Sequence, residues 1–189
     1  MSKQSWKGST LLNPEPPVLV SCGGLDKPNL ITIGWTGTIC TQPSMVSISV
    51  RPERYSHQLL CESGQFAINL PTEKLVRAID WCGVKSGRDV DKFAACGLHA
   101  APGSVLTDCP VLEESPVNLE CRITQRIPLG SHDLFWPRWW PAMWTRACWT
   151  KKASCVWTRQ TSSCTATASI WPLAESWAPS ATVCGRKSP

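Results

Sequence analysis

In the stretch Met45-Val46-Ser47-Ile48-Ser49-Val50-Arg51, apolar and polar side chains alternate from Val46 onward, and Pro52 follows it. Strict alternation with a period of two is typical of a half-buried β-strand. The apolar members then point into a core, while Ser47, Ser49 and Arg51 share the opposite face. The segment therefore predicts a β-protein with one polar strand face that carries hydroxyls and a guanidinium.

The sequence on either side continues this pattern as far as Phe135. Ile31, Ile33 and Trp35 fall on one face of a second alternating run, and Gly and Pro clusters separate the runs. Thr72 and Ser86 stand where helices would begin, and Gly64 and Gly97 where helices would end. Short strands joined by tight turns indicate a mainly β fold, an antiparallel barrel with helical insertions. We expect strands over 18–20, 30–36, 66–70 and 117–127 and from 134, and helices over 54–62, 72–82 and 86–96.

The formal charge of +5 is unevenly distributed. Residues 1–135 sum to −1 and residues 136–189 to +6, so a nucleic-acid interpretation would depend on the C-terminal part being a folded element. We expect no nucleic-acid partner. No stretch is long and apolar enough to span a membrane, and the N-terminus lacks an apolar signal core, which predicts a cytoplasmic protein without a membrane partner.

The cysteines and histidines show no metal-binding or dithiol spacing. The cysteines before residue 136 are well separated with no CxxC pair, and we expect buried or half-buried free thiols. His57 and His99 lack partners at ligand spacing, which predicts surface positions and no metal. No GxGxxG follows a strand, so a separate nicotinamide-binding domain is not expected.

From residue 136 onward the strand and helix periodicities stop. Tryptophan and methionine have single codons, so the effect of one lost base near Phe135 can be tested. Restoring the frame turns Trp136-Pro137 into alanine, Trp139-Trp140 into valine and Trp144-Thr145 into aspartate. The stretch can then read L-A-E-V-V-A-G-D-V-D-E, a strand and an acidic turn. We interpret 1–135 as one partial domain and 136–189 as a frameshifted tail without a native-like fold; a genuine Trp-rich basic tail is the alternative.

Three segments carry side chains that suit a phosphorylated, polar ligand. The polar face with Ser49 and Arg51 offers hydroxyls and a cation, and Thr36-Gly37-Thr38 offers two hydroxyls around a residue that permits close approach. Lys85-Ser86-Gly87-Arg88 is a basic turn before an expected helix N-terminus. Spacing alone favours solvent-side strand positions for the serines, the cations could be surface charge, and Trp35 could belong to the core.

Many short segments of the sequence resemble the flavoredoxin type of flavin reductase-like proteins. These segments occur in the same order and without a gap from about residue 6 to 135, and segments near the C-terminus resemble the same family once the reading frame is restored. The matching words are Trp6-Lys7-Gly8-Ser9-Thr10-Leu11-Leu12-Asn13-Pro14, Ile33-Gly34-Trp35-Thr36-Gly37-Thr38-Ile39-Cys40, Val46-Ser47-Ile48-Ser49-Val50-Arg51-Pro52, Phe66-Ala67-Ile68-Asn69-Leu70-Pro71, Cys82-Gly83-Val84-Lys85-Ser86-Gly87-Arg88-Asp89 and Gly130-Ser131-His132-Asp133.

The resemblance implies a split β-barrel homodimer that holds FMN near the subunit interface. It implies hydride or electron transfer between FMN and a reduced nicotinamide, NADH or NADPH, or another donor; an electron carrier with little nicotinamide turnover and a non-functional frameshifted product are the alternatives. The flavin would carry the chemistry, so no catalytic side chain is assigned, although His132 could sit near the ring. The FMN-contacting residues implied by the resemblance are Trp35, Thr36, Thr38, Ser49, Arg51, Ser56, Lys85, Ser86 and Lys92.

Overall fold

One antiparallel sheet forms most of the structure. The computed structural model describes residues 3–5, 7–139 and 143–144. Its main sheet has the strand order β2-β1-β5-β8-β9-β4-β3, and β10 pairs with β8. The strands are β1 (Val18–Cys22), β2 (Asn29–Ile33), β3 (Thr36–Thr41), β4 (Ser44–Val50), β5 (Gln65–Leu70), β8 (Val117–Pro128), β9 (Asp133–Trp139) and β10 (Met143–Trp144).

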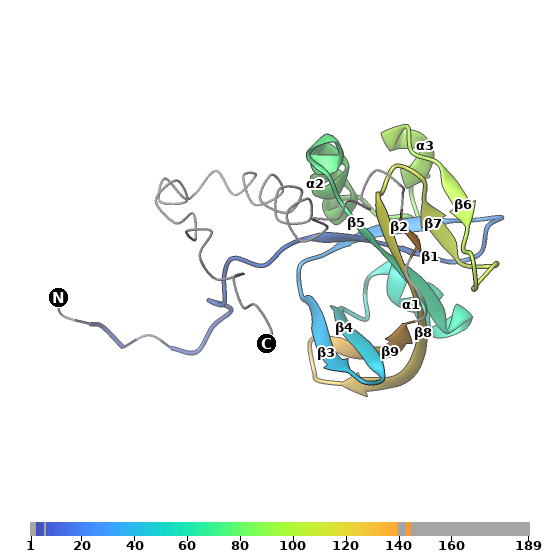
Figure 1. Ribbon diagram of the computed structural model, residues 1–189. Helices are drawn as coiled ribbons and strands as arrows, with labels where there is room; N and C mark the ends of the chain where they lie inside the picture. The colour runs from blue at the N-terminus through green and yellow to red at the C-terminus, as the bar shows by residue number, and fades with distance from the viewer. Residues whose placement is uncertain (1–2, 6, 140–142, 145–189) are drawn as a thin grey trace, which may run out of the picture.

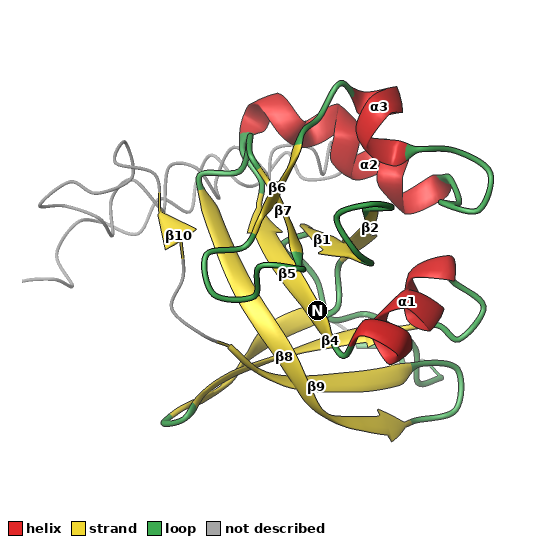
Figure 2. Cartoon of the chain, turned by 90° about the vertical axis from the view of Figure 1, so that its right-hand side faces the viewer, coloured by secondary structure: helices red, strands yellow, loops and turns green. Residues whose placement is uncertain are grey.

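The sheet curls so that one face encloses an apolar core. The long strands β8 and β9 turn together across it and bring β4 and β3 round toward the other strands (Figures 1 and 2). Val46, Ile48 and Val50 of β4 are all buried in this core, together with Val20 of β1 and Phe66 of β5. The alternation in 45–51 therefore placed its apolar side chains where it predicted, inside a curled sheet.

Helices and a small second sheet pack against the main sheet. α1 (Tyr55–Ser63) follows β4; the short helix η1 (Glu73–Leu75), α2 (Val76–Val84) and α3 (Lys92–Cys96) follow β5. α2 and α3 lie side by side at one end (Figure 2) and bury Leu19 and Leu30 in a second apolar cluster. β6 (Ala100–Pro102) pairs with β7 (Pro110–Leu112) beside them.

A buried carboxylate fastens the loop that joins β6 to β7. Glu120 of β8 is fully buried and accepts hydrogen bonds from the amides of Ser104, Val105 and Leu106 and from the Ser104 hydroxyl, at 2.6–3.0 Å. Burial alone would raise the pKa of Glu120, but these hydrogen bonds outweigh it, and the pKa lies below its ordinary value. The ionised form is therefore the one that the fold stabilises.

The expected strand over 30–36 is wrong in one respect. The chain leaves β2 after Ile33, passes through Gly34 and Trp35, and starts β3 at Thr36. Ile31 and Ile33 are buried as predicted, whereas Trp35 keeps 40% of its surface exposed and does not join the core. The pattern of alternation does not reveal where a strand stops if only two residues separate it from the next strand.

Two helix starts also differ from the expectation. Thr72 precedes η1 rather than an α-helix, and its side chain makes no capping hydrogen bond. Ser86 opens a turn and not a helix, because α3 begins at Lys92 and Asp91 is its N-cap, accepting from the amide of Ala94. The helix ends at Gly64 and Gly97 are confirmed, with φ of 65° and 63°.

The described part of the chain reaches slightly beyond the predicted boundary at residue 135. β9 pairs with β8 as far as the register Cys121 with Trp139, and β10 places Met143 opposite Asn118. The remainder of the predicted frameshifted tail, 140–142 and 145–189, lies outside the described residues. Among the residues that are described, no helix has the length and apolar character needed to cross a bilayer.

Candidate functional site

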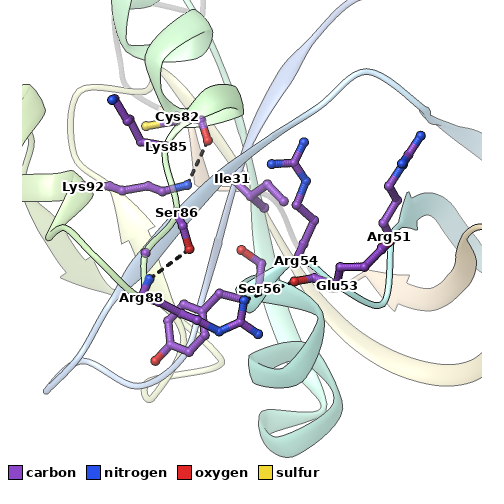
Figure 3. A pocket seen from close by; sticks show the side chains of 12 residues that line it. Ile31, Arg51, Glu53, Arg54, Ser56, Cys82, Lys85, Ser86, Arg88 and Lys92 are labelled. Atoms are coloured by element: carbon purple, nitrogen blue, oxygen red, sulfur yellow. Dashed lines mark hydrogen bonds between the residues drawn. The ribbon is translucent and has the colours of Figure 1, made fainter.

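A basic cavity opens where β2, the loop after β4, the start of α1 and the α2–α3 connection meet. Its volume is about 330 Å³, within the range of roughly 300–1,000 Å³ typical of ligand pockets. Figure 3 shows the side chains converging on it from these four segments. The lining residues are Ile31, Arg51, Glu53, Arg54, Tyr55, Ser56, Cys82, Lys85, Ser86, Gly87, Arg88 and Lys92.

Positive charge dominates this lining, with five cations and one acid, Glu53. Among the residues that the structure describes, Arg51, Arg54 and Lys85 have no carboxylate within ion-pair distance. Figure 3 shows Arg51 and Arg54 extending in the same direction from the loop after β4. A cavity with this imbalance attracts an anion, because each cation keeps its full charge for a ligand.

Lys92 is the cation that the fold exposes least, at 3% of its surface. Its Nζ donates to the carbonyl oxygen of Cys82 at 2.8 Å, and no carboxylate of the described residues pairs with it. Burial lowers the pKa of Lys92 below its ordinary value, with repulsion from Arg54 adding to the effect. A buried ammonium held by one carbonyl can still donate to an anion, which would offset the desolvation of its charge.

Arg88 has a structural role in the same wall. Its Nη1 donates to the carbonyl oxygen of Glu53 at 3.1 Å, and its guanidinium carbon lies 5.4 Å from the centre of the Tyr55 ring. These contacts tie the 85–88 turn to the residues just before and at the start of α1. The turn and the helix start thus form one rigid wall of the cavity.

Neutral polar groups position the base of α1 against β2. Asn29 is 4% exposed and its Nδ2 donates to Ser56 Oγ at 2.8 Å. Burial raises the pKa of the neighbouring Cys22 thiol to about 11, so this thiol stays uncharged at neutral pH. Gly87 packs directly on this group, since a Cβ there would overlap Oδ1 of Asn29 and lie 3.1 Å from the Tyr55 ring. Only a residue without a side chain fits at that position.

A second, smaller cavity of about 180 Å³ continues from the first and shares Ile31, Arg51 and Arg54 with it. Its wall includes Trp35 and His132, whose ring centres lie 4.5 Å apart at an angle of 42°. The two cavities together offer a cationic part and an adjoining part lined by aromatic rings. A ligand with an anionic end and a flat ring system would match both.

The structure brings most of the predicted site residues to these two cavities. Thr36 and Thr38 are the exceptions: they lie in β3 opposite Ile48 and Val46, and neither lines the first or the second cavity. His132, which the sequence analysis named as a residue that could lie near the ring, lines the second cavity together with Trp35. The predicted residues that line at least one cavity are Trp35, Ser49, Arg51, Ser56, Lys85, Ser86 and Lys92.

One electrostatic expectation is wrong. The 85–88 turn does not adjoin a helix N-terminus but directly follows the C-terminal end of α2, with Lys85 as its C-cap, and α3 begins only at Lys92. Two helix starts line the cavity, that of α1 through Arg54, Tyr55 and Ser56 and that of α3 through Lys92. Sequence reasoning missed Arg54 and Asn29, although the second arginine in Arg51-Pro52-Glu53-Arg54 could have indicated a continuation of the cationic edge.

The predicted positions of the histidines and thiols hold with two corrections. His99 is exposed as expected, but His57 is buried against Asp133, because the start of α1 packs on the β8–β9 turn. Cys61 is exposed, whereas the other six described cysteines are buried or half-buried as predicted. Within the described segments no cluster of side chains could hold a metal ion.

The model of the flavin reductase like domain matches residues 11–138. An uncharacterized protein of Archaeoglobus fulgidus is 30% identical over 112 residues, 59% of this chain and 63% of that protein. An NADPH-flavin oxidoreductase of Streptomyces viridifaciens is 28% identical over 54% of this chain and 52% of its own length. The chain thus spans between about half and two thirds of these two relatives.

Solved structures of flavoredoxins superpose on the fold. Flavoredoxin of Desulfovibrio vulgaris (Miyazaki F) is 30% identical, with a TM-score of 0.72, over 79% of this chain and 80% of that one. Flavoredoxin of Methanosarcina acetivorans is 25% identical, with a TM-score of 0.74, over 80% of each chain. The expected mainly β fold, an antiparallel split barrel with helical insertions, is confirmed by these neighbours.

Proposed function

Because the chain belongs to the flavin reductase-like family, we propose that it binds FMN in the two joined cavities and passes hydride or electrons between FMN and a donor. Flavin-related redox chemistry is the function of this family, and the cavities suit the flavin. The observation that carries the proposal is the excess of cations around the larger cavity, with Lys92 buried and without a carboxylate partner among the described residues.

The larger cavity would hold the phosphate. A phosphate dianion needs cations and hydrogen-bond donors that other groups have not neutralised. Arg51, Arg54 and Lys85 provide charge, and Lys92 adds a buried donor from the opposite wall. Ser56 and Ser86 add hydroxyls between the two walls. The donors fit this group, and their charge favours a phosphorylated flavin over one without phosphate.

The smaller cavity would hold the isoalloxazine ring. Trp35 and His132 form an aromatic edge, and Ser49 adds a hydroxyl at the same cavity. When bound, the flavin supplies the site that accepts and returns hydride, so the protein only has to hold and orient the ring and shape its surroundings. His132 makes a hydrogen bond of 3.0 Å with Ser131, and it is the histidine that lines the smaller cavity.

A reduced nicotinamide, NADH or NADPH, is the donor that we propose, docking transiently on the exposed face of the ring. The similarity to flavoredoxins favours one alternative, an electron carrier that exchanges electrons with a protein partner and turns over little nicotinamide. We also propose a homodimer, as the family resemblance implies. Trp35 remains 40% exposed at the edge of the smaller cavity, which would be covered if a second subunit completed the site.

The test is direct titration of the full chain with FMN, followed by flavin fluorescence and the visible spectrum. Arg51→Gln should weaken FMN binding by roughly tenfold or more, as expected for the loss of one charge-assisted contact. Arg77→Gln, an exposed cation of α2 outside both cavities, is the matched control and should leave affinity unchanged. Folded protein that binds no FMN would overturn the proposal.

A second measurement separates the two redox alternatives. NADH or NADPH is added to the FMN-loaded protein, and oxidation of the nicotinamide is followed with free flavin or oxygen as acceptor. Rapid turnover supports the reductase. Bound FMN that is reduced only by a protein donor supports the electron carrier.

A further inference from the structure

A cluster of four reactive or charged side chains lies outside the two cavities. His57 and Cys61 stand four residues apart on one face of α1, Arg126 comes from β8 and Asp133 from the start of β9. None of the four lines either cavity of the proposed flavin site. The sequence did not predict a role for this cluster, because Arg126 and Asp133 lie far from α1 in the chain.

The contacts of His57 orient its imidazole ring between Asp133 and Cys61. Its Nε2 lies 2.8 Å from Oδ2 of Asp133, and both side chains are buried. A carboxylate accepts, so in the neutral ring Nε2 carries the proton and Nδ1 keeps its lone pair. Nδ1 faces the sulfur of Cys61 at 3.9 Å. The imidazole is therefore oriented as a base toward the thiol, and Asp133 would stabilise the imidazolium that forms.

Arg126 completes the arrangement from the other side of the sulfur. Its Nη1 lies 3.4 Å from Cys61 Sγ, and its Nε lies 3.6 Å from Asp133 Oδ2. The hydrogen bond to Cys61, together with the charges of Cys61 and Asp133, raises the pKa of Arg126. Positive charge at this distance favours the thiolate, which is the nucleophilic form of cysteine. Moving the proton from Cys61 to His57 yields alternating charges: thiolate, imidazolium, carboxylate and guanidinium.

Accessibility distinguishes this thiol from the other cysteines that the structure describes. Cys61 is exposed, while Cys22, Cys82, Cys109 and Cys121 are buried. Burial raises the pKa of Cys82 and of Cys109 to about 12, which keeps those thiols protonated and inert. Glu62, the charged residue that follows Cys61 on α1, accepts a hydrogen bond from Gln58 at 2.8 Å.

From this juxtaposition we infer that Cys61 is a nucleophilic thiol, activated by His57 and Arg126, that forms mixed disulfides with low-molecular-weight disulfides. The Cys61 thiolate attacks one sulfur of the small disulfide, the new S–S bond forms and the original S–S bond breaks. Cys61 is oxidised and the released half is reduced, leaving as a thiolate that takes the proton from His57. Asp133 is a positioning residue, since it acts through the imidazole.

The experiment uses the full chain and a neutral probe, bis(2-hydroxyethyl) disulfide, so that Arg126 acts on the thiolate and not by attracting a charged reagent. Mass spectrometry of peptides follows the mixed disulfide at each cysteine over time at neutral pH. We expect Cys61 to react roughly tenfold faster than the half-buried Cys40, because an ordinary thiol is only a few per cent thiolate there.

Matched variants test the two activating groups. Arg126→Gln and His57→Gln should each slow Cys61 several-fold, whereas Arg122→Gln on the same strand and the exposed His99→Gln should not. Arg126 is itself exposed, with 48% of its side chain accessible, so its replacement leaves the core intact. Arg126→Lys should restore part of the rate by returning a positive charge.

A spectroscopic readout separates activation from simple exposure. The ultraviolet absorbance of the thiolate at neutral pH should fall in Cys61→Ser and in Arg126→Gln, but not in Cys40→Ser. Equal rates for Cys61 and Cys40 in the unmodified chain would overturn the inference. So would a Cys61 rate and a thiolate absorbance that neither Arg126→Gln nor His57→Gln changes.

Discussion

Replacing Lys92 with methionine should have opposite effects on FMN binding and on the stability of the ligand-free fold. Methionine retains the apolar stem and removes the ammonium of Lys92, a residue that is only 3% exposed and whose Nζ donates to the carbonyl oxygen of Cys82. Burial lowers the pKa of Lys92, so below that pKa the fold bears the cost of a buried charge. Lys92→Met removes that cost.

The magnitudes follow from the contacts. The lost hydrogen bond to Cys82 is worth roughly 0.5–1.5 kcal/mol, while a buried ion that lacks a counter-ion costs several kcal/mol. The free energy of unfolding without ligand should therefore stay the same or rise by about 1 kcal/mol, a Tm increase of about 2–4 °C for a chain of this size. A charge-assisted contact to phosphate is worth roughly 1.5–3 kcal/mol, so FMN should bind about tenfold to a hundredfold more weakly.

The assay combines thermal unfolding without ligand, thermal unfolding with excess FMN, and titration of flavin fluorescence. In Lys92→Met the melting temperature without ligand should hold or rise, and the increase that FMN brings should shrink. Arg77→Met, which removes an exposed cation from α2, serves as the control for both quantities. A variant that loses stability yet binds FMN like the unmodified chain would refute the reasoning, because Lys92 would then be a structural residue only.

Three other predictions concern the wall of the cavity, the buried carboxylate and the reading frame. Gly87→Ala should cost roughly 1–3 kcal/mol of stability and weaken FMN binding, since its Cβ would overlap Asn29, whereas Gly37→Ala meets nothing within 4 Å and should be near neutral by urea unfolding. The lowered pKa of Glu120 means that its stabilisation is present above the unfolded-state pKa and is lost as the pH falls through the folded one. Chemical unfolding at a series of acidic pH values should therefore show a steeper loss for the unmodified chain than for Glu120→Gln, which should be less stable at neutral pH; equal slopes would contradict this. Inserting one base after the Phe135 codon should increase soluble yield and bound flavin, and unchanged yield and colour would remove the frameshift hypothesis.

The alternation in 45–51 was enough to predict which face of this strand is buried, because a strand with a period of two has only one way to bury Val46, Ile48 and Val50 together. The glycine ends at Gly64 and Gly97 were equally local, since a left-handed residue at a helix end depends on its own backbone. Long-range packing decided the errors. Whether Trp35 stays in a strand, and whether Ser86 opens a helix or a turn, depends on neighbours supplied by β4 and α3.

What the sequence by itself determined was the class of fold and the chemistry available: a curled antiparallel sheet with hydroxyls and cations at its strand ends and turns. Only the tertiary structure decided which of these groups converge. It left Thr36 and Thr38 outside the two cavities, buried Lys92 with no counter-ion from the described part of the chain, and brought His57, Cys61, Arg126 and Asp133 together. The physical reason is that a side chain's direction is set by its own backbone, whereas its partners are set by how distant strands and helices pack.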